Sequence, residues 1–497
     1  MNASQTRFLG IDLGTGSLKV ALIDESGVER AVASVAYTLD TPQPGWAEID
    51  VERWWRALVE ACARLPEGER AVVRGIGFSG QMHGVVLTDA AGQALRPAML
   101  WPDTRAHDLL DAWAVEWSES EGAASNPVAP GMAGPLLRWL KQHEPATAAA
   151  ARWALQPKDW LRVRLAGAAQ EAFVADPSDA CATALAAPDG AWDLALIERL
   201  GLPAGWFAPL APSGAASGTL AADAARALGV PAGVVLATGA GDTPCAALGS
   251  GLREEGDALL TTGTGGQILV TVRTVPPARR GLHRYRSASG GWYAMAAMQN
   301  VGVALEAARG WLAYDWAQAY EEAFAVPPSA TLTFLPYLSG ERSPWLDPAA
   351  RGGWLGAGIG DTRGVLMRAA FEGVAFALRA GLDALREANA GADSGTPDAA
   401  IATLKLAGGG SVDPRWRQLL ADVLGAQLDA IDCPNAATRG AALLGGVAGG
   451  HWRMDELAAL APAATRVAQP REDAALAQRY ARFIDLYGRV RTWFAAT

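Results

Sequence analysis

The sequence has few of the residues that build metal centres and disulfide networks. Its 497 residues include only four cysteines and five histidines. The cysteines lie far apart and show no Cys-x-x-Cys spacing, and the histidines show no i, i+4 pair. Neither a disulfide framework nor a zinc site is therefore indicated, and we expect reduced thiols.

Basic clusters and long apolar runs are also missing. Only 19% of the residues are charged, the formal net charge is −10, and lysines and arginines form no cluster. Nucleic acid or an anionic membrane surface would need a basic stripe, so both are disfavoured as partners. The longest weakly polar stretch, residues 230–251, is interrupted by Asp242 and by glycines, and the first residues lack the apolar core of a signal peptide. We expect a cytoplasmic protein without a membrane segment.

The two best-known nucleotide-binding motifs are absent as well. No Gly-x-x-x-x-Gly-Lys-[Ser/Thr] occurs, and no Gly-x-Gly-x-x-Gly follows the first predicted strand. These absences exclude a P-loop site and disfavour a NAD-dependent dehydrogenase. Half of the residues are hydrophobic, and the chain is longer than one hydrophobic core supports. The composition therefore predicts a large enzyme of two or three domains.

A short glycine-rich pattern occurs twice, about half a chain apart. The first copy contains Asp12 and the turn Gly14-Thr15-Gly16, and the second, 249 residues later, contains Gly263-Thr264-Gly265. Each copy is an apolar run, a glycine turn and a second apolar run, which is typical of a β-hairpin with exposed N–H groups at its tip. The repeat predicts two similar domains that hold a nucleotide between them. Since only the first copy carries a carboxylate, a metal is expected near Asp12.

Two further strand ends carry chemically useful residues. Asp242 follows the apolar run 233–238 and opens a predicted helix, so it is the candidate general base, with an N-cap role as the alternative. The apolar run 400–407 ends in Gly408-Gly409-Gly410-Ser411, and a proline-led helix follows. Such a turn is either a phosphate or ribose seat or a simple capped turn. A long helix is predicted from an N-cap at Asp361.

Several stretches, spread over nearly the whole chain, together resemble the FGGY carbohydrate kinases. They are the Asp12 hairpin, Gly80-Gln81-Met82-His83-Gly84, Leu100-Trp101-Pro102-Asp103-Thr104-Arg105, Pro157-Lys158-Asp159-Trp160-Leu161-Arg162, Asp176-Pro177-Ser178-Asp179-Ala180, residues 239–251, residues 334–344, and Gly408 to Ser411 with Trp416-Arg417-Gln418. The resemblance implies an α/β fold of two duplicated actin-like, ribonuclease-H-type domains with an interdomain cleft. With a hinge near residue 250, residues 1–250 would form a sugar-binding domain that carries the catalytic aspartate. Residues 251–497 would form a domain that mainly binds ATP.

The resemblance also implies roles for individual residues. Asp242 would accept the proton, and Asp12 would act near Mg²⁺ and the γ-phosphate of ATP, as a catalytic residue and metal ligand. The residues implied in sugar binding are Gln81, Met82, His83, Trp101 and Asp103. The residues implied in nucleotide binding are Gly14, Thr15, Thr264, Gly265, Gly409, Gly410 and Ser411.

The implied activity is transfer of the γ-phosphate of ATP to the terminal primary hydroxyl of a ketopentose. The Gly-Gln-Met-His-Gly and Pro-Lys-Asp-Trp stretches favour D-xylulose. Gluconate, another pentulose or a polyol stays open as the acceptor, because Thr243 and Pro102 stand where asparagines are usual in such kinases. An actin- or chaperone-like ATPase without a sugar substrate is the alternative from a different class. The oligomeric state is open, with a homodimer among the alternatives.

Overall fold

The computed structural model describes residues 6–111, 126–390 and 401–495. They form two compact units. Unit 1 contains the residues up to Arg253 together with Tyr285–Trp292 and Asn435–Pro462. Unit 2 contains Glu254–Arg284, Tyr293–Pro434 and the residues from Ala463 onward. The chain first leaves unit 1 near residue 250, where the boundary is predicted, and then returns to it twice.

Unit 1 is built on a seven-stranded sheet. The strands are β1 (Arg7–Leu13), β2 (Ser17–Ile23), β3 (Glu29–Ala36), β5 (Val73–Gly80), β9 (Ala216–Thr219), β10 (Val235–Ala237) and β11 (Ala240–Gly241). Their order is β3-β2-β1-β5-β10-β9, with β11 paired to β5. β1 and β2 form an antiparallel hairpin, whereas β1, β5 and β10 run parallel. The apolar sequence of β1 fits this central position, because the strand is buried along most of its length.

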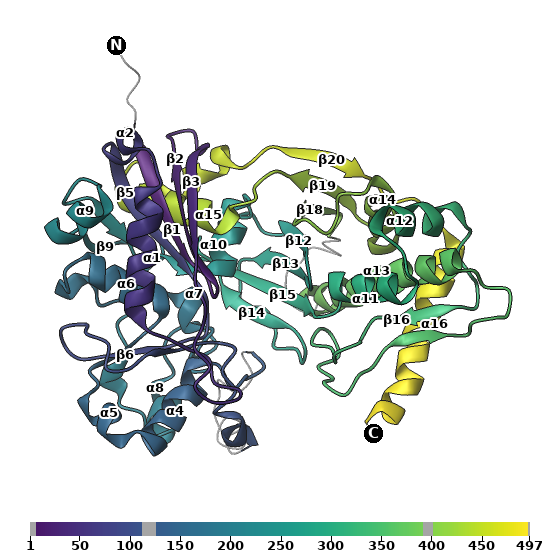
Figure 1. Ribbon diagram of the computed structural model, residues 1–497, viewed down its shortest axis with the longest axis horizontal. Helices are drawn as coiled ribbons and strands as arrows, with labels where there is room; N and C mark the ends of the chain where they lie inside the picture. Colours follow the sequence, from purple (N-terminus) through teal and green to yellow (C-terminus); the bar gives the residue numbers. More distant parts are fainter. Residues whose placement is uncertain (1–5, 112–125, 391–400, 496–497) are drawn as a thin grey trace, which may run out of the picture. The chain divides into compact units, whose positions relative to one another are not determined.

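Helices pack on this sheet. They are α1 (Val51–Ala63), α6 (Pro157–Leu165), α9 (Ala222–Leu228), α10 (Asp242–Gly249) and α15 (Ala436–Ala448). α1 contacts β2 and β3, and α6 contacts β5, whereas α15 lies against β1 and β5 and packs on α10. Figure 1 shows the yellow-green α15 beside the purple β1, although these elements lie near opposite ends of the sequence.

Glycines allow α15 to lie directly on its neighbours. A Cβ atom added to Gly77 would be 1.8 Å from the carbonyl oxygen of Ala441, and one added to Gly249 would be 1.9 Å from that of Ala436. No side chain fits between backbones at this separation. The backbone of α15 therefore packs directly on β5 and on α10. Because of this packing, residues 435–462 belong to unit 1.

A smaller part of unit 1 has its own apolar core. Its elements are β4 (Glu48–Ile49), β6 (Val86–Thr88), β7 (Ala98–Met99), β8 (Trp153–Leu155), α4 (Ala133–His143), α5 (Pro145–Ala150), α7 (Pro177–Ala180) and α8 (Leu194–Arg199), and the short α2 (Glu67–Arg70) precedes β5. β4 pairs with β7, and β6 pairs with β8. Leu136, Leu137 and Ile197 belong to a buried cluster with Val85 and Met99.

Unit 2 repeats the strand arrangement of unit 1. The strands of its sheets are β12 (Ala258–Thr262), β13 (Gly266–Val272), β14 (His283–Arg286), β15 (Trp292–Met298), β16 (Thr333–Leu335), β17 (Gly353–Leu355), β18 (Thr403–Ala407), β19 (Gln427–Ile431) and β20 (Ala464–Ala468). The adjoining ends of β14 and β15 and the turn between them, Tyr285–Trp292, belong to unit 1. The large sheet has the order β14-β15-β13-β12-β18-β19-β20. β12 and β13 form an antiparallel hairpin, β18 and β19 run parallel to β12, and β20 is antiparallel. The predicted α/β duplication is confirmed by this shared topology.

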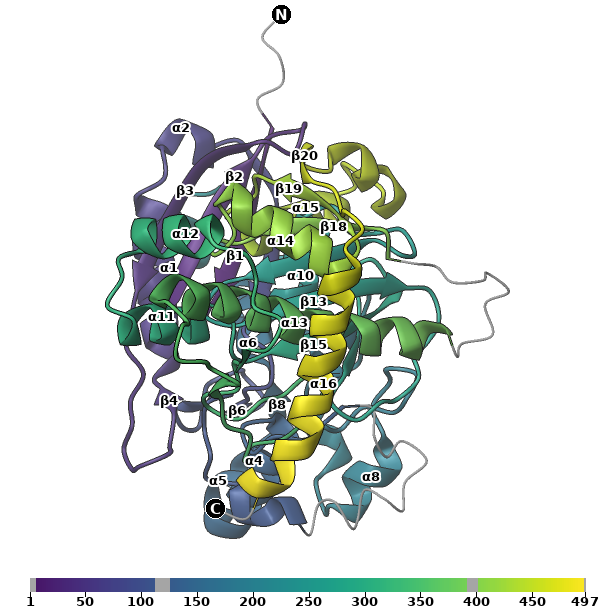
Figure 2. The same ribbon diagram turned by 90° about the vertical axis from the view of Figure 1, so that its right-hand side faces the viewer.

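One long helix organises the core of unit 2. The helices are α11 (Gly302–Trp311), α12 (Trp316–Ala325), α13 (Arg363–Ala390), α14 (Pro414–Leu424) and α16 (Ala474–Phe494). α13 contacts α11, α12 and α14, and Figure 2 shows the yellow α16 crossing it, where Phe376 meets Phe483 at a ring distance of 5.6 Å. Among the described residues, no helix combines the length and apolarity needed to cross a bilayer.

The predicted N-cap of α13 is wrong by one residue. The helix begins at Arg363, and the Thr362 Oγ1 accepts the N–H of Val365 at 3.4 Å. Asp361 instead accepts the N–H of Gly358 through its Oδ2 at 2.7 Å. Thr362 is therefore the capping residue, and Asp361 stabilises the preceding turn.

Candidate active site

Asp12 lies near the end of β1, where the strand register places it opposite Ser79 of β5. The Ser79 Oγ donates a hydrogen bond to the Asp12 Oδ1 at 2.7 Å. Burial raises the pKa of Asp12 above its ordinary value, while Ser79 and the positive charge of Lys19 act in the opposite direction. No other hydrogen bond reaches this carboxylate from the described part of the chain. Asp12 is thus a partly buried acid with one oxygen, Oδ2, left for a ligand.

Asp242 is the first residue of α10, and Gly241 occupies the N-cap position. Its Oδ1 accepts hydrogen bonds from the N–H of Thr243 at 2.6 Å and from the Thr243 Oγ1 at 3.2 Å. Burial, and secondly the negative charge of Asp12, raise the pKa of Asp242 to about 6. A carboxylate with this pKa is largely ionised at neutral pH and binds a proton more readily than an ordinary aspartate.

Strand pairing explains why the two aspartates interact, although 230 positions of sequence separate them. On β5, Ser79 pairs with Asp12 of β1 on one side and with Ala240 of β11 on the other. Asp242 follows β11 directly. The ends of three adjacent strands therefore bring both carboxylates to one edge of the sheet, which is where parallel sheets commonly bind ligands.

The tip of the β1–β2 hairpin presents backbone N–H groups. The N–H of Gly14 donates to the Ser17 carbonyl at 3.0 Å, and the Gly14 carbonyl accepts the Tyr37 hydroxyl at 2.6 Å. The N–H groups of Thr15 and Gly16 have no acceptor among the described residues. A tip with fixed carbonyls and two available N–H groups can bind an anion.

Gln81, Met82 and His83 follow β5 and line the same edge. Gln81 is buried, and its Nε2 donates to the Gly14 carbonyl at 3.3 Å. Met82 lies against the backbone next to Asp242, since a Cβ added to Gly241 would be 2.7 Å from the Met82 Cγ. His83 has a positive φ of 78°, which is uncommon outside glycine, and its Nδ1 donates to the Ala182 carbonyl at 2.6 Å. Such a backbone marks a position fixed by its surroundings.

Trp101 and Asp103 differ in their environments. Trp101 is 49% exposed, and its Nε1 donates to the Thr15 Oγ1 at 2.8 Å, so it lies beside the hairpin tip. Asp103 is fully buried, and its carboxylate accepts the N–H of Ala47 at 2.7 Å and binds the Arg105 guanidinium at 2.7 Å. A sugar contact by Asp103 stays a prediction, and the described contacts give this carboxylate a structural function.

The predicted nucleotide residues of unit 2 gather at the matching edge of its own sheet. At the β12–β13 tip, the carbonyls of Gly263 and Thr264 accept the N–H groups of Gly302 and Val303, both at 3.0 Å. The N–H groups of Thr264 and Gly265 have no acceptor within the described ranges. This arrangement of fixed carbonyls and two available N–H groups is the one found at the β1–β2 tip of unit 1.

The glycine run after β18 lies beside this tip. Because β18 runs parallel to β12, Gly408 follows the sheet edge, and the Thr262 Oγ1 meets the Ser411 Oγ at 2.6 Å. Gly410 donates its N–H to the Thr262 carbonyl at 3.3 Å, whereas a Cβ at Gly409 would meet nothing within 4 Å. The structure thus brings the tip residues Thr264 and Gly265 close to the run 409–411 within unit 2. Open space lies next to Gly409.

A buried charge cluster supports the Asp242 segment, and no role for it is predicted from the sequence. Lys158 lies 2.8 Å from Asp159, 2.9 Å from Asp176 and 2.9 Å from Asp179. The Ser178 Oγ donates to the Asp176 Oδ2 at 2.5 Å and accepts the N–H of Gly241 at 3.1 Å. The cluster therefore reaches the backbone that immediately precedes Asp242. Its sequence signal is the pair of charged stretches 157–162 and 176–180 within mostly apolar surroundings.

Two family models together match most of the chain. The N-terminal domain of the FGGY family of carbohydrate kinases matches residues 7–249, and the C-terminal domain matches residues 258–449. The chain belongs to this family and is a sugar phosphotransferase.

Individual relatives agree with this assignment. The xylulose kinase of Escherichia coli strain K12 is 32% identical over 437 residues, which cover 85% of this chain and 86% of that protein. The solved xylulose kinase of Rhodospirillum rubrum has a TM-score of 0.86 and 28% identity, covering 98% of this chain and all of that one. The gluconate kinase of Lactobacillus acidophilus has a TM-score of 0.88 at 22% identity, which is a likeness of fold alone.

Proposed function

We propose that the chain transfers the γ-phosphate of ATP to the terminal primary hydroxyl of D-xylulose. The observation that carries this proposal is the meeting of Asp12 and Asp242 at one sheet edge, where Asp242 has a raised pKa of about 6. The similarity to proteins named xylulose kinases supports the choice of sugar. Phosphoryl transfer needs positioned phosphates, charge neutralisation and a group that takes the hydroxyl proton, and this site offers candidates for each.

Asp242 is the proposed proton acceptor. As the sugar oxygen bonds to the γ-phosphorus, the bond from that phosphorus to the bridging oxygen of ADP breaks, and the hydroxyl proton passes to the carboxylate. The Asp242 Oδ1 is held by Thr243, so its Oδ2, which has no hydrogen-bond partner among the described residues, is the atom available to the hydroxyl. The fixed orientation of this carboxylate contributes to the rate by positioning the base.

The sugar is proposed to contact the loop that follows β5. Met82 lies against Gly241, next to the base, and the His83 imidazole is held by the Ala182 carbonyl, so both side chains have fixed positions. Trp101 offers a half-exposed indole ring for stacking on the sugar. Asp103 is left out of this contact set because Arg105 and Ala47 already occupy its oxygens.

The phosphates are proposed to bind the N–H groups of the glycine tips. In unit 1 these belong to Thr15 and Gly16, beside the predicted Gly14, and in unit 2 to Thr264 and Gly265. The open backbone at Gly409 leaves room for the nucleotide beside Gly410 and Ser411. Backbone N–H groups suit this task because they bind phosphate oxygens without adding a side-chain charge.

The donor set at Asp12 fits Mg²⁺. No group of three or more His, Cys, Asp or Glu side chains that could hold a metal occurs within the described residues. Mg²⁺ does not need such a group, because it commonly binds one or two carboxylates together with phosphate oxygens and water. Asp12 provides a carboxylate with an available oxygen, and burial raises its pKa, so a bound cation would stabilise the ionised form. A bound Mg²⁺ would neutralise charge on the phosphates.

A panel of acceptors tests the proposed function. ADP release is measured with D-xylulose, D-ribulose, gluconate and glycerol, and the highest kcat/KM is expected for D-xylulose. A higher kcat/KM with gluconate or a polyol would show that the chain is a carbohydrate kinase with a different acceptor from D-xylulose. ATP turnover that no sugar changes would overturn the proposal in favour of an ATPase without a sugar substrate.

Replacement of the base tests the mechanism. Asp242→Asn is expected to lower kcat by about 10²- to 10⁴-fold, the usual loss for a general base. Glu60→Gln is the matched control, because Glu60 lies on the exposed face of α1 and pairs with Arg64. Near wild-type turnover in Asp242→Asn would show that another group accepts the proton.

A further inference from the structure

Unit 1 contains a cavity that lies outside the proposed reaction. Its volume is about 540 Å³, which is within the range of small-molecule sites. All of its described lining residues belong to unit 1, and none of them is proposed to bind sugar or nucleotide. The lining comes from Pro177, from the loop 210–215, from the turn 286–290 between β14 and β15, and from Val447 and Met454.

A single arginine provides the charge of this cavity. The Arg286 guanidinium lies 5.1 Å from the ring centroid of Trp292, and its stem packs on the turn at Gly190, where an added Cβ would be 2.8 Å from the Arg286 Cγ. The buried Nε of Arg286 has no hydrogen-bond partner, and no ion pair joins its guanidinium to a carboxylate of the described residues. A partly buried cation without a counter-charge is costly, so an anion is the expected partner.

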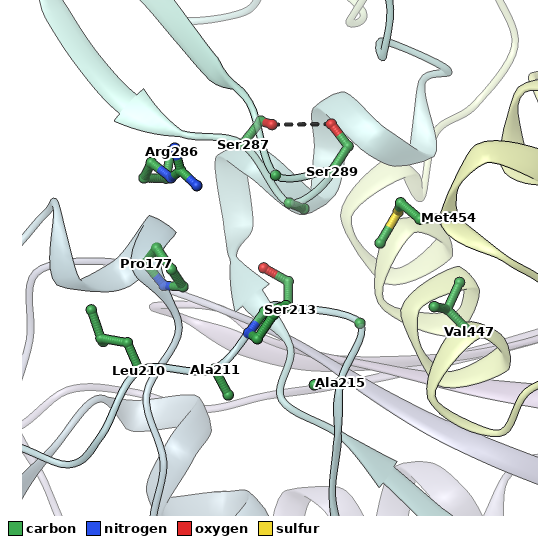
Figure 3. Close-up of a pocket in the computed structure, with 14 residues that line it drawn as sticks. Pro177, Leu210, Ala211, Ser213, Ala215, Arg286, Ser287, Ser289, Val447 and Met454 are labelled. Atoms are coloured by element: carbon green, nitrogen blue, oxygen red, sulfur yellow. Dashed lines mark hydrogen bonds between the residues drawn. The ribbon is translucent and has the colours of Figure 1, made fainter. Parts of the chain in front are cut away.

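The serines of the cavity supply one further donor. The Ser287 Oγ and the Ser289 Oγ are 3.0 Å apart, so one hydroxyl donates to the other and the second keeps its proton for a ligand. Ser213 donates to the Asp176 Oδ2 at 3.2 Å, so its own proton is used. In Figure 3 the Arg286 guanidinium and the Met454 thioether point into the space above Ser213. Ser213 lies across this space from the turn that carries Ser287 and Ser289, so polar groups occur on more than one wall of an otherwise apolar cavity.

We propose that this cavity binds a small organic carboxylate with an apolar body. The two carboxylate oxygens match the paired N–H groups of Arg286, and the remaining serine proton completes the polar contacts. The carbon body would lie against Leu210, Val447 and Met454. The site has one positive charge, which matches a monoanion.

The same charges disfavour a phosphate ester. A phosphomonoester carries about −1.5 to −2 charge at neutral pH, more than Arg286 neutralises alone. The Asp176 carboxylate, bonded to the cavity residue Ser213, adds negative charge nearby. A phosphomonoester should therefore bind more weakly than a carboxylate of similar size.

Calorimetric titration of the full-length protein, without ATP or sugar, tests the proposal. The probes are benzoate, hexanoate and phenyl phosphate. At least one of the two carboxylates is expected to bind, and Arg286→Met should weaken that binding by about ten- to a hundredfold, the loss typical of a charged hydrogen-bonding partner. Arg226→Met is the matched control, because Arg226 is an exposed arginine of unit 1 outside the cavity lining. Its affinity should equal that of the wild type.

A second variant separates the charge of the site from its shape. Leu210→Trp fills part of the cavity and leaves Arg286 in place, so it should also weaken carboxylate binding. The proposal is overturned if neither carboxylate binds up to roughly 10 mM, a concentration that would detect even weak sites. Unchanged affinity in Arg286→Met, or tighter binding of phenyl phosphate than of benzoate, would overturn it as well. Because binding is measured without the kinase reaction, these outcomes are independent of which sugar is phosphorylated.

Discussion

Thr243 controls how tightly Asp242 holds its proton. Both the N–H and the hydroxyl of Thr243 donate to the Asp242 Oδ1, and both lower the pKa that burial and Asp12 raise. Removing the hydroxyl in Thr243→Val destabilises the carboxylate, so the pKa of Asp242 should rise above about 6. Because the base acts when ionised, the acidic limb of the kcat/KM profile should move to higher pH.

Thr243→Ser is the control for this prediction, since it keeps the hydroxyl. Profiles of kcat/KM between about pH 5 and 9 for the three proteins give the comparison. An acidic limb that Thr243→Val leaves in place, or moves to lower pH, would contradict the assignment of this limb to Asp242.

Asp179 is expected to carry a proton in the folded protein. The buried cluster contains the carboxylates of Asp159, Asp176 and Asp179 but only two cations, Lys158 and Arg162. Burial is the main cause that raises the pKa of Asp179 to about 8, against the attraction of Lys158. The positive and negative charges of the cluster are therefore equal in number at neutral pH when one of its three carboxylic acids is protonated.

This proton predicts the pH dependence of stability. The folded state holds a proton that the unfolded chain releases, so the Asp179 contribution to stability is lost as pH rises from the ordinary aspartate range toward about 8. Asp179→Asn mimics the neutral acid in both states, so its unfolding free energy should match that of the wild type at about pH 4, exceed it increasingly as pH rises toward about 8, and show a flatter pH dependence. One proton changes the unfolding free energy by up to about 1.4 kcal/mol per pH unit. Urea titrations at several pH values give these slopes.

Asp176→Asn is the comparison for that experiment. Asp176 accepts hydrogen bonds from Ser178 and Ser213 and pairs with Lys158, so both of its carboxylate oxygens have partners in the folded protein. Its loss should cost about 3–5 kcal/mol, the usual cost of breaking a buried ion pair. Equal stability of the two variants would contradict the assignment of the proton to Asp179.

The sequence predicts which acids lie at strand ends but not which side chains support them. Asp12 and Asp242 follow apolar runs, so their place at the end of a strand can be read from the chain. Ser79 and Lys158 act through partners that only strand pairing and helix packing bring near. The sequence likewise does not show that Asp103 is buried, because its burial depends on the ion pair that its carboxylate forms with the Arg105 guanidinium.

At the scale of the elements, glycines determine how closely β5 and α15 approach. A Cβ at Gly77 would be 1.8 Å from a backbone oxygen, which cannot rotate away as a side chain can. Gly77→Ala should therefore lower the free energy of unfolding by about 3 kcal/mol, at the upper end of overpacking effects. Because β5 carries Ser79 to Asp12, kcat should also fall.

Gly68→Ala is the matched control for this substitution. A Cβ at Gly68, in the short helix α2, would meet nothing within 4 Å. Its effect on the free energy of unfolding should stay within about 1 kcal/mol. Thermal and urea unfolding of the two variants measure the difference, and a similar loss in both would contradict close packing as the cause.

Elements with strong periodic patterns are also the ones that the sequence predicts. Both glycine hairpins and α13 occur where expected, since apolar spacing and turn residues are local signals. The predicted ends differ from the observed ones: the strand expected over 233–238 covers only Val235–Ala237, and α13 begins after Thr362 rather than after Asp361. These ends depend on capping and pairing partners that lie outside the local pattern.

At the scale of the whole molecule, unit 1 is discontinuous in sequence. Internal similarity predicts two domains of equal length, and the strand orders agree with the duplication. No local pattern in the sequence predicts that residues 435–462 return to unit 1. Their return depends on close contacts that glycines allow between α15 and the strands β1 and β5. A linear division of the chain therefore leaves part of unit 1 in the other half.

A truncated chain tests this organisation. A fragment of residues 1–253 lacks α15, so the apolar and glycine-lined surface of β1 and β5 has no cover. We expect this fragment to keep helical and sheet signals in far-ultraviolet circular dichroism but to lose the near-ultraviolet signal and to bind ANS. Joining residues 435–462 to it through a flexible linker should restore the near-ultraviolet signal. A fully native spectrum for the fragment alone would show that α15 is dispensable.

The late position of α15 also has a consequence for synthesis on the ribosome. Domains commonly fold as they leave the ribosome. Unit 1 cannot complete its fold at that point, because it includes a helix that begins only at residue 436. At about 5–20 residues per second, translation from residue 253 to residue 435 takes roughly 10–40 s. During that time the nascent first unit exposes the apolar surface of β1 and β5 that α15 later covers. We therefore expect chaperones that bind exposed apolar surface to bind the nascent chain at this stage.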